Sequence, residues 1–363
     1  MRLVYFLLSV LSLLVLLPCD GVSGRPPPEA GTGSMRHLAE TPLRKLDAPV
    51  RAGPFPRTSG DPALLIDNGL YRMYLTSPNL KRMQGGIALS TSTDGQTWNV
   101  ADTASKEEGP GLVLVGRDGD WDEQLETAYV LKVNDDYYLY YCGYPKVGWP
   151  KNPGQIGLAI SSDGINFVRA SEFPVLAPTP GFFDADGLYS PEVVLREGRF
   201  EMIYAGHCYD SSKCPIGIYI LGATSKDGRS WTKRKEPVLS PHPALRWTAN
   251  GVAEPALLKG DELWYMFITG GLGDGEQRVI GVARGPTPFG PWQIRRKPLL
   301  TATEGMYDSW GNGVLAPTAV IENGTLRIWY LTSFEGQDIH VIGYAELPWP
   351  IDGWDDSVKA PKR

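Results

Sequence analysis

Acidic side chains stand at the start of several short apolar strands that recur along the 363-residue sequence. Aligning the five copies puts these residues at one equivalent position: Asp61, Glu126, Ser190, Glu254 and Ala316. A further carboxylate, Glu192, lies two residues beyond Ser190 and shares its face, because side chains alternate along a strand. We therefore expect four carboxylates to converge where these strands begin.

Gathering like charges is costly, because burial and repulsion raise the pKa of some of the groups. The useful outcome is one ionised and one protonated carboxyl group, the pair that hydrolysis of a glycosidic bond requires. The alternative is that these carboxylates cap strands or bind a structural cation. No cofactor is expected, and the absence of CxxC and HExxH patterns predicts no zinc site.

Aromatic and polar residues cluster in the loops around the same strand ends. The predicted substrate contacts are Trp121, Trp247, His207, Trp310 and Asn250. His207 is included because, of the four histidines, it alone directly follows a second strand. A single aromatic residue in such a loop is more often core packing than a ligand contact. Recurrence beside the carboxylates nevertheless favours sugar binding.

A pattern of strands repeated five times must position these side chains. An apolar strand begins near residues 61, 126, 190, 254 and 316, and an aromatic strand and a small-residue strand follow each. Turn signals such as Asp67-Asn68-Gly69 join the first two strands of each copy. The sequence therefore predicts an all-β fold, a five-bladed β-propeller with four antiparallel strands per blade and the first strands around a channel. A β-sandwich is the disfavoured alternative.

The two ends of this repeat indicate how the ring closes. The fifth copy lacks a fourth strand after Trp354, and Ala48-Pro49-Val50 resembles that strand. We expect the N-terminal segment to pair there and cover an exposed edge. The predicted propeller domain spans residues 46–363, and residues 25–45 are predicted to be a flexible leader.

Residues 1–24 have the pattern of a secretory signal peptide. Arg2 precedes an apolar run from Leu3 to Leu17, and small residues suited to cleavage follow. A retained anchor helix and a lipoprotein attached through Cys19 are less favoured alternatives. We expect a secreted or periplasmic monomer without membrane contact after signal cleavage.

Charge and cysteines complete the expectations. The net charge of −6, without a basic stripe, argues against nucleic acid and anionic membranes as partners, so a carbohydrate substrate is expected. In an oxidising compartment Cys208 and Cys214 could form a disulfide. Cys142 lies in an apolar strand and is predicted to be a buried thiol.

The repeated strands and SxDGxxW phrases resemble the five-bladed furanosidase superfamily over nearly all of residues 46–354. That superfamily includes family 43 arabinanases and xylosidases, family 32 β-fructosidases and family 130 mannoside phosphorylases. The family 43 pattern implies that Asp61 is the general base, Glu126 a helper and Glu192 the acid. Glu126 departs from the family's usual Asp, and Glu192 follows its proline instead of preceding it. Glu254-Pro255 fits better locally but belongs to the fourth blade.

The resemblance implies an exported glycoside hydrolase that acts on an oligo- or polysaccharide by an inverting, two-carboxylate mechanism. Two alternatives stay open, namely a non-catalytic carbohydrate-binding propeller and a glycoside phosphorylase. The sugar, the linkage and the choice of Glu192 or Glu254 as acid are left undecided by the sequence.

Overall fold

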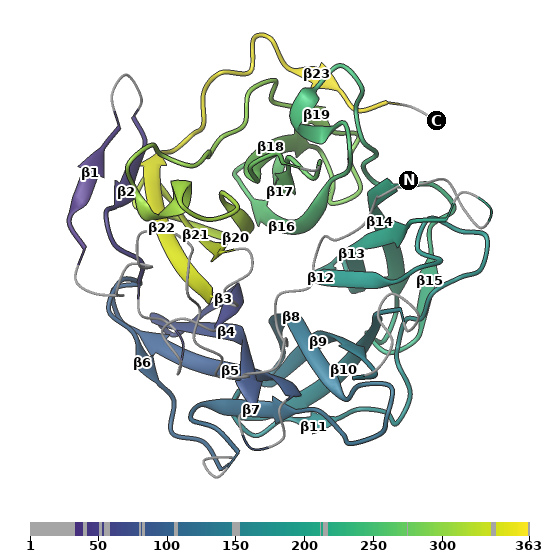
Figure 1. Cartoon of the computed structure of the whole chain (residues 1–363). Coiled ribbons are helices and arrows are strands. Elements are labelled where there is room, and N and C mark those ends of the chain that lie inside the picture. The colour runs from purple at the N-terminus through teal and green to yellow at the C-terminus, as the bar shows by residue number, and fades with distance from the viewer. Residues whose placement is uncertain are drawn as a thin grey trace, which may run out of the picture.

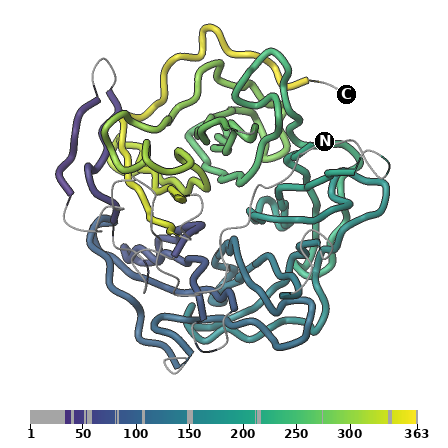
Figure 2. The backbone as a smooth tube through the Cα atoms, viewed as in Figure 1, coloured from purple at the N-terminus to yellow at the C-terminus, as the bar shows by residue number. Residues whose placement is uncertain are grey.

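The computed structural model describes residues 33–38, 42–50, 53, 59–79, 81, 84–104, 108–146, 153–210, 212, 217–273, 275–334 and 339–361. Five antiparallel sheets form blades in a ring (Figure 1), and Figure 2 shows the chain passing round that ring in sequence order. Helical structure in the described ranges is limited to two 3₁₀ turns, η1 (Arg246–Thr248) and η2 (Tyr307–Ser309). The predicted all-β, five-bladed propeller is thus confirmed.

Blades 1 to 3 are each built from consecutive strands. Blade 1 contains β3 (Gly60–Asp67), β4 (Leu70–Asn79), β5 (Gln84–Ser92) and β6 (Asn99–Val100), with β7 (Leu112–Val115) also paired to β5. Blade 2 contains β8 (Gln124–Val133), β9 (Asp136–Tyr144), β10 (Gln155–Ser161) and β11 (Val168–Arg169). Blade 3 contains β12 (Leu188–Arg196), β13 (Arg199–Cys208), β14 (Gly217–Ser225) and β15 (Trp231–Lys233).

Blades 4 and 5 also receive strands from the two ends of the described chain. Blade 4 contains β16 (Ala253–Lys259), β17 (Trp264–Gly270), β18 (Val279–Gly285) and β19 (Gln293–Ile294), with β23 (Val358–Lys359) outermost. Blade 5 contains β20 (Leu315–Glu322), β21 (Thr325–Phe334) and β22 (Ile339–Pro348), followed outward by β2 (Arg44–Leu46) and β1 (Met35–His37). In Figure 1 the purple β1 and β2 lie outside the yellow β22.

The N-terminal segment therefore pairs with blade 5, but two predicted boundaries were wrong. The closing strand is Arg44–Leu46, which pairs with Ala345 and Glu346, whereas Val50 makes only an isolated bridge to Ile342. The segment predicted as a flexible leader, 25–45, includes β1 and most of β2. Sequence reasoning missed β1 and β2 because each is only three residues long and rich in charge. The predicted signal peptide, residues 1–24, lies outside the described residues.

A buried ion pair anchors this closing strand. Lys45 Nζ lies 2.5 Å from Asp308 Oδ2, and both side chains are fully buried. Lys45 Nζ also donates to the Thr301 carbonyl at 2.6 Å and to Thr303 Oγ1 at 2.9 Å. Removing one partner of such a pair typically costs about 3–5 kcal/mol, because the other charge stays buried. Lys45 therefore ties the N-terminal strand to the interior of blade 5.

The Asp-Gly turns connect neighbouring blades. In the turns at Asp94, Asp163 and Asp227, the Asp carboxylate accepts hydrogen bonds from two backbone N–H groups that follow, and the Gly carbonyl accepts one from an aromatic side chain of the preceding blade. The aromatic donors are Trp329 to Gly95 at 2.8 Å, Tyr74 to Gly164 at 2.9 Å and Tyr140 to Gly228 at 2.8 Å. Apolar residues fill the space between each pair of adjacent blades. The sheets are therefore fixed relative to one another at their outer turns and through their cores.

The described cysteines agree with the predicted states. Cys208 is disulfide-bonded, whereas Cys142 is a free, buried thiol. Cys214, the predicted partner of Cys208, lies outside the described residues. In the part of the chain that the structure describes, no helix is long and apolar enough to cross a membrane.

Candidate active site

Every innermost strand carries a β-bulge near its start, and one residue of each bulge has a left-handed backbone. The φ values are +47° for Asp61, +46° for Thr127, +50° for Ser190, +50° for Glu254 and +46° for Ala316. This conformation costs a non-glycine residue on the order of 1–3 kcal/mol. The register shift places two residues opposite one on the second strand. The five bulges therefore define a structurally equivalent position in all five blades.

This equivalence corrects the predicted alignment in blade 2. Thr127 occupies the left-handed position, so Glu126 lies one residue earlier and pairs with Cys142. The other four blades have a proline directly after this position, whereas blade 2 has Ala128. Without that proline as a marker, the sequence alignment slipped by one residue.

A cavity at the centre of the ring is lined by the bulges of all five blades. Its wall consists of Asp61, Pro62, Ala63, Thr127, Ala128, Ser190, Pro191, Glu192, Glu254, Pro255, Ala316, Pro317 and Thr318. The enclosed space is about 380 Å³ with its open mouth included, which is within the range of small-molecule sites. The structure thus brings three of the four predicted carboxylates to one cavity.

Asp61 of β3 is half-buried in this wall. The Thr76 hydroxyl donates to its carboxylate, and Thr76 Oγ1 itself accepts from the Thr127 N–H at 2.9 Å. Burial, followed by the nearby negative charge of Glu254, raises the pKa of Asp61 to about 7, and the Thr76 hydrogen bond opposes this rise. Asp61 therefore titrates close to neutral pH.

Glu126 of β8 does not contribute to the cavity wall but lies close enough for its charge to interact with Asp61. The Tyr144 hydroxyl donates to Glu126 Oε2 at 3.1 Å. Burial, followed by the charge of Asp61, raises the pKa of Glu126 to about 8, with a smaller contribution from Glu254. At neutral pH Glu126 is therefore mostly protonated.

Glu254 of β16 is held by more donors than Asp61 or Glu126. Its Oε2 accepts from Thr269 Oγ1 at 2.6 Å and from the Ala316 N–H at 2.8 Å, and the side chain is only 6% exposed. Burial raises the pKa of Glu254, whereas both donors and the positive charge of Arg278 lower it. Of these three carboxylates, Glu254 has the best-stabilised ionised form.

Glu192 of β12 has a different environment although it lines the same cavity. Its Oε1 accepts from the Leu257 N–H of β16 at 3.1 Å. Thr318 makes the corresponding contact between blades 5 and 1, because its Oγ1 accepts from the Leu64 N–H at 3.2 Å. Burial raises the pKa of Glu192 well above its usual value. Glu192 thus links the inner strands of two blades.

Two of the predicted sugar contacts, Trp121 and Trp247, are packed within blades and do not line the cavity. The Trp121 ring stacks on Tyr141, with centroids 6.1 Å apart, and its Nε1 donates to the Glu172 carbonyl at 2.8 Å. Trp247 is buried over Gly270 and Gly281, and its Nε1 donates to the Arg296 carbonyl at 2.9 Å. These contacts account for both tryptophans without a ligand.

Trp310 and Asn250 lie on the loops that enter β20 and β16, outside the cavity wall. Trp310 is 38% exposed, and Asn250 Nδ2 lies 3.5 Å from Glu276 Oε2. Both loops lead into bulges of the cavity, so these side chains lie at the end of the ring where the carboxylates gather. Their position is compatible with contact to an extended ligand.

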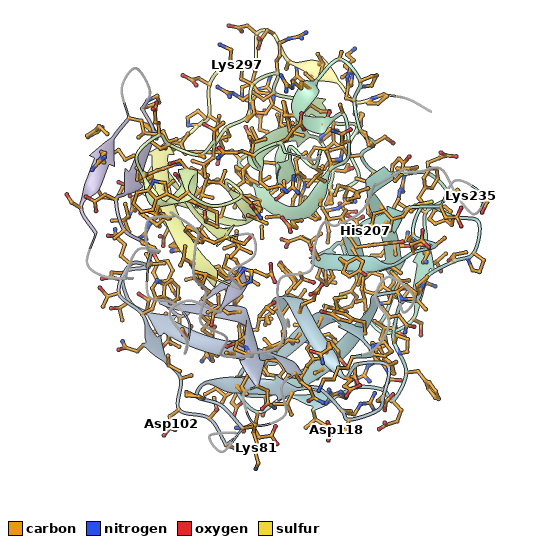
Figure 3. The ribbon with its side chains drawn as sticks, viewed as in Figure 1. Lys81, Asp102, Asp118, His207, Lys235 and Lys297 are labelled. Carbon is orange, nitrogen blue, oxygen red and sulfur yellow. The ribbon has the colours of Figure 1, made fainter. Side chains whose placement is uncertain are left out.

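His207, at the end of β13, is 1% exposed and lies nearer the centre of the ring than the labelled Lys81, Lys235 and Lys297 (Figure 3). Its Nδ1 lies 2.5 Å from the Tyr209 hydroxyl, and its ring lies 4.5 Å from that of Tyr189. Burial lowers the pKa of His207 to about 3, so the imidazole is neutral at ordinary pH. His207 is thus unsuited to general acid–base chemistry in this conformation.

Sequence reasoning missed the residues that set the state of the carboxylates, notably Thr76, Thr269 and Arg278. The available signal was a threonine at the matching place in two aromatic strands, YLTS of blade 1 and FITG of blade 4. No group of three or more His, Cys, Asp or Glu side chains within the described ranges is arranged to hold a metal ion.

Comparison with known proteins agrees with this geometry. Residues 128–307 match the glycosyl hydrolases family 32 N-terminal domain, whereas no curated protein matches the sequence. A thermostable family-43 glycoside hydrolase is 16% identical, with a TM-score of 0.59 over 87% of this chain and 99% of that one.

Two further solved structures share the fold at similar distance. An endo-arabinase from Bacteroides thetaiotaomicron is 15% identical, with a TM-score of 0.61 over 84% of this chain and 98% of that one. A β-1,2-mannobiose phosphorylase from Listeria innocua is also 15% identical, with a TM-score of 0.60 over 86% and 92%. The fold that the repeat predicted is thus shared with five-bladed β-propeller glycoside hydrolases, and the central part of the chain matches a glycosyl hydrolase domain.

Proposed function

We propose that the protein hydrolyses a glycosidic bond of an oligo- or polysaccharide, with Asp61 as general base and Glu126 as general acid. The observation that carries this proposal is the cluster of Asp61, Glu126 and Glu254, in which the pKa of Asp61 is about 7 and that of Glu126 about 8. Two carboxyl groups of unequal pKa supply the ionised base and the protonated acid that this reaction needs.

The protonation states favour this division of roles. Asp61 loses its proton first and can then take one from an attacking water. Glu126 still holds its proton in the same pH range and can donate it to the leaving oxygen. Both side chains are half-buried, whereas those of Glu192 and Glu254 are buried; Asp61 lines the cavity and Glu126 lies outside its wall.

This proposal replaces the expected acids, Glu192 and Glu254. Glu192 Oε1 is engaged by the Leu257 N–H, which gives it a structural role between blades. Although burial raises the pKa of Glu254, its two hydrogen-bond donors and the charge of Arg278 favour the ionised form, and we propose that Glu254 is ionised and has no proton to give. We assign Glu254 the role of a fixed negative charge that raises the pKa of the other two carboxylates.

Inversion at the anomeric carbon is part of the proposal. It requires room for a water between base and sugar, which corresponds to carboxyl groups about 6.5–9.5 Å apart, whereas about 5–5.5 Å leads to retention. Asp61 lines the cavity and Glu126 belongs to the next blade, and this placement on separate blades supports the first case. Proton NMR of the first-formed product reports the anomer directly.

The test is an activity screen of the purified protein on plant and microbial polysaccharides, oligosaccharides and aryl glycosides. Hydrolysis that is independent of phosphate and absent from an Asp61→Asn/Glu126→Gln double variant is expected. Asp135→Asn, in an exposed turn between β8 and β9, is the matched control and should keep full activity. Sugar binding without turnover across the screen would refute hydrolysis.

A glycoside phosphorylase is the second candidate, because the mannobiose phosphorylase shares the fold. One measurement distinguishes a phosphorylase from a hydrolase: a phosphorylase would consume added inorganic phosphate and form a sugar phosphate. Phosphate-dependent turnover in the same screen would replace hydrolysis with this reaction.

We also propose that the protein is exported. The pattern of residues 1–24 supports this, as does the disulfide of Cys208, because such bonds persist in oxidising compartments. N-terminal sequencing of native protein from cell fractions tests it. Export predicts mature protein that begins near Arg25 outside the cytoplasm, and recovery of Met1 from cytoplasm would contradict it.

A further inference from the structure

A buried arginine lies beside the carboxylate cluster. Arg278 precedes β18, and its side chain is almost fully buried. Its backbone N–H donates to the Asn312 carbonyl at 2.7 Å, and its carbonyl accepts from the Val314 N–H at 3.1 Å. Its Nη1 donates to the Gly271 carbonyl. Arg278 is thereby fixed between the end of β17 and the segment that enters β20.

The same two segments hold Glu254. Thr269, which donates to Glu254 Oε2, lies two residues before Gly271, and Ala316, which donates to the same oxygen, lies two residues after Val314. The Arg278 guanidinium group and the Glu254 carboxylate are therefore held by the same two backbone segments, the end of β17 and the segment that enters β20. Consistently, the positive charge of Arg278 lowers the pKa of Glu254 against the effect of burial.

We propose that Arg278 is a positioning residue that keeps Glu254 ionised, so that blade 4 supplies a permanent negative charge to the cavity beside Asp61. This inference rests on the proposed function and deepens it, because it locates the device that sets the pH range of the acid–base pair. Arg278 acts on the reaction only through Glu254.

The groups around Glu254 determine how far Arg278 is needed to stabilise its ionised form. Asp61 of β3 and Glu126 of β8 lie close enough for the charge of Glu254 to act on them, and Glu192 of β12 lies on the adjacent inner strand with its Oε1 directed to Leu257. The donors Thr269 and Ala316 are neutral. Arg278 is thus a positive charge that stabilises the ionised form of Glu254 against the effect of burial.

The inference is tested in the free protein by NMR titration of carboxyl groups labelled with ¹³C at glutamate Cδ, with Glu254→Gln to assign the signal. In the wild type, the Glu254 signal should be that of a carboxylate at pH 7. In Arg278→Gln, which keeps a donor for Gly271 but no charge, the pKa of Glu254 should rise by about 1–3. Arg278→Lys should resemble the wild type.

The matched control is Arg284→Gln, because Arg284 belongs to β18 but contacts Gln293 and Trp354. It should leave the Glu254 titration unchanged. An unchanged titration in Arg278→Gln, or equal shifts in the Gln and Lys variants, would overturn the charge-based role. If Arg278→Gln does not fold, a protonated Glu254 in the wild type at pH 7 would overturn it as well.

A kinetic measurement separates this inference from the proposed function. In an active enzyme, neutral Glu254 no longer raises the pKa of Asp61, so Arg278→Gln should move the rising limb of the pH–rate profile to lower pH. Direct action of Arg278 on Asp61 would move it to higher pH and contradict the inference. The Arg278→Gln/Glu254→Gln double variant should match Glu254→Gln. If the NMR result holds but no hydrolysis is found, the proposed function fails and the inference stands.

Discussion

Blades 1 and 4 present the same arrangement with opposite consequences. Each has a carboxylate at the left-handed bulge position, Asp61 or Glu254, and a threonine on the second strand that donates to it, Thr76 or Thr269. In blade 1 the N–H of the next blade reaches only the threonine, whereas in blade 4 the extra methylene of Glu254 lets its carboxylate accept that N–H directly.

The environments then diverge. Asp61 is half-buried and its pKa is raised to about 7, whereas the pKa of Glu254 is raised by burial against the opposing effects of two donors and the Arg278 charge. One methylene and one arginine thus turn a repeated structural position into a titrating group in blade 1 and a fixed charge in blade 4. Function arises here from small departures from the repeat.

The largest effect is expected for the acid. Glu126→Gln removes the proton donor and should lower turnover of unactivated substrates by about 10²–10⁴-fold. Aryl glycosides with good leaving groups need no protonation, so their turnover should fall far less. Kinetics on a series of leaving groups measures this difference. Equal losses across the series would remove Glu126 from the role of acid.

The next effect concerns the pH–rate profile. The proposal predicts a bell-shaped kcat/KM profile, with a rising limb from the Asp61 pKa near 7 and a falling limb from the Glu126 pKa near 8. In Glu254→Gln both limbs should move to lower pH, because a negative charge has been removed. If neither limb moves, the charge of Glu254 does not raise the pKa of Asp61 or Glu126.

Stability should distinguish the two carboxylates in magnitude. The folded-state pKa of Asp61 is raised from 3.8 to about 7, so its contribution to stability is present at low pH and is lost between about pH 4 and 7. Asp61→Asn should therefore become more stable than the wild type as pH rises through this window. Because burial also raises the folded-state pKa of Glu254, Glu254→Gln should gain stability in the same direction but by less, since its two donors and Arg278 oppose the rise.

Urea denaturation at pH 4 and at pH 8 provides both comparisons. If Glu254→Gln gains at least as much stability as Asp61→Asn between pH 4 and pH 8, the contrast between the blades is wrong.

The smallest effect on turnover is expected for Glu192. Glu192→Gln retains an oxygen for the Leu257 N–H and should keep turnover near the wild-type value. Glu192→Ala leaves that N–H without its acceptor, which should lower the free energy of unfolding by about 1–3 kcal/mol. Parallel kinetics and denaturation measure the two outcomes. A loss of turnover in Glu192→Gln, without loss of stability, would restore Glu192 as an acid.

The fold could be predicted from the sequence because its signals repeat. Five copies of strand, hairpin turn and Asp-Gly turn overdetermine a propeller even though each copy alone is ambiguous. The closing strand was placed too late in the chain because Arg44–Leu46 carries no apolar alternation. Its position depends on the buried contact of Lys45 with Asp308, two residues that are far apart in the sequence.

The site was only partly predictable for a related reason. Asp61, Glu192 and Glu254 could be placed at one cavity from the strand register, but Glu126 was misaligned because blade 2 lacks the marker proline. Which carboxylates are ionised depends on donors from other blades, such as Ala316 for Glu254 and Leu257 for Glu192. Local sequence does not encode those contacts, and the same holds for Trp247, whose glycine-lined packing site is formed by distant strands.

The central claim is that blade 1 provides the base. The most direct measurement compares Asp61→Asn with Glu254→Gln at the pH optimum of each variant, on a confirmed substrate. The account predicts that Asp61→Asn lowers kcat by at least ~10²-fold while calorimetry still detects sugar binding, since the amide keeps the shape and loses the basicity. Glu254→Gln should retain more activity, because it alters only the surrounding charge. Near-normal turnover in Asp61→Asn would contradict the account.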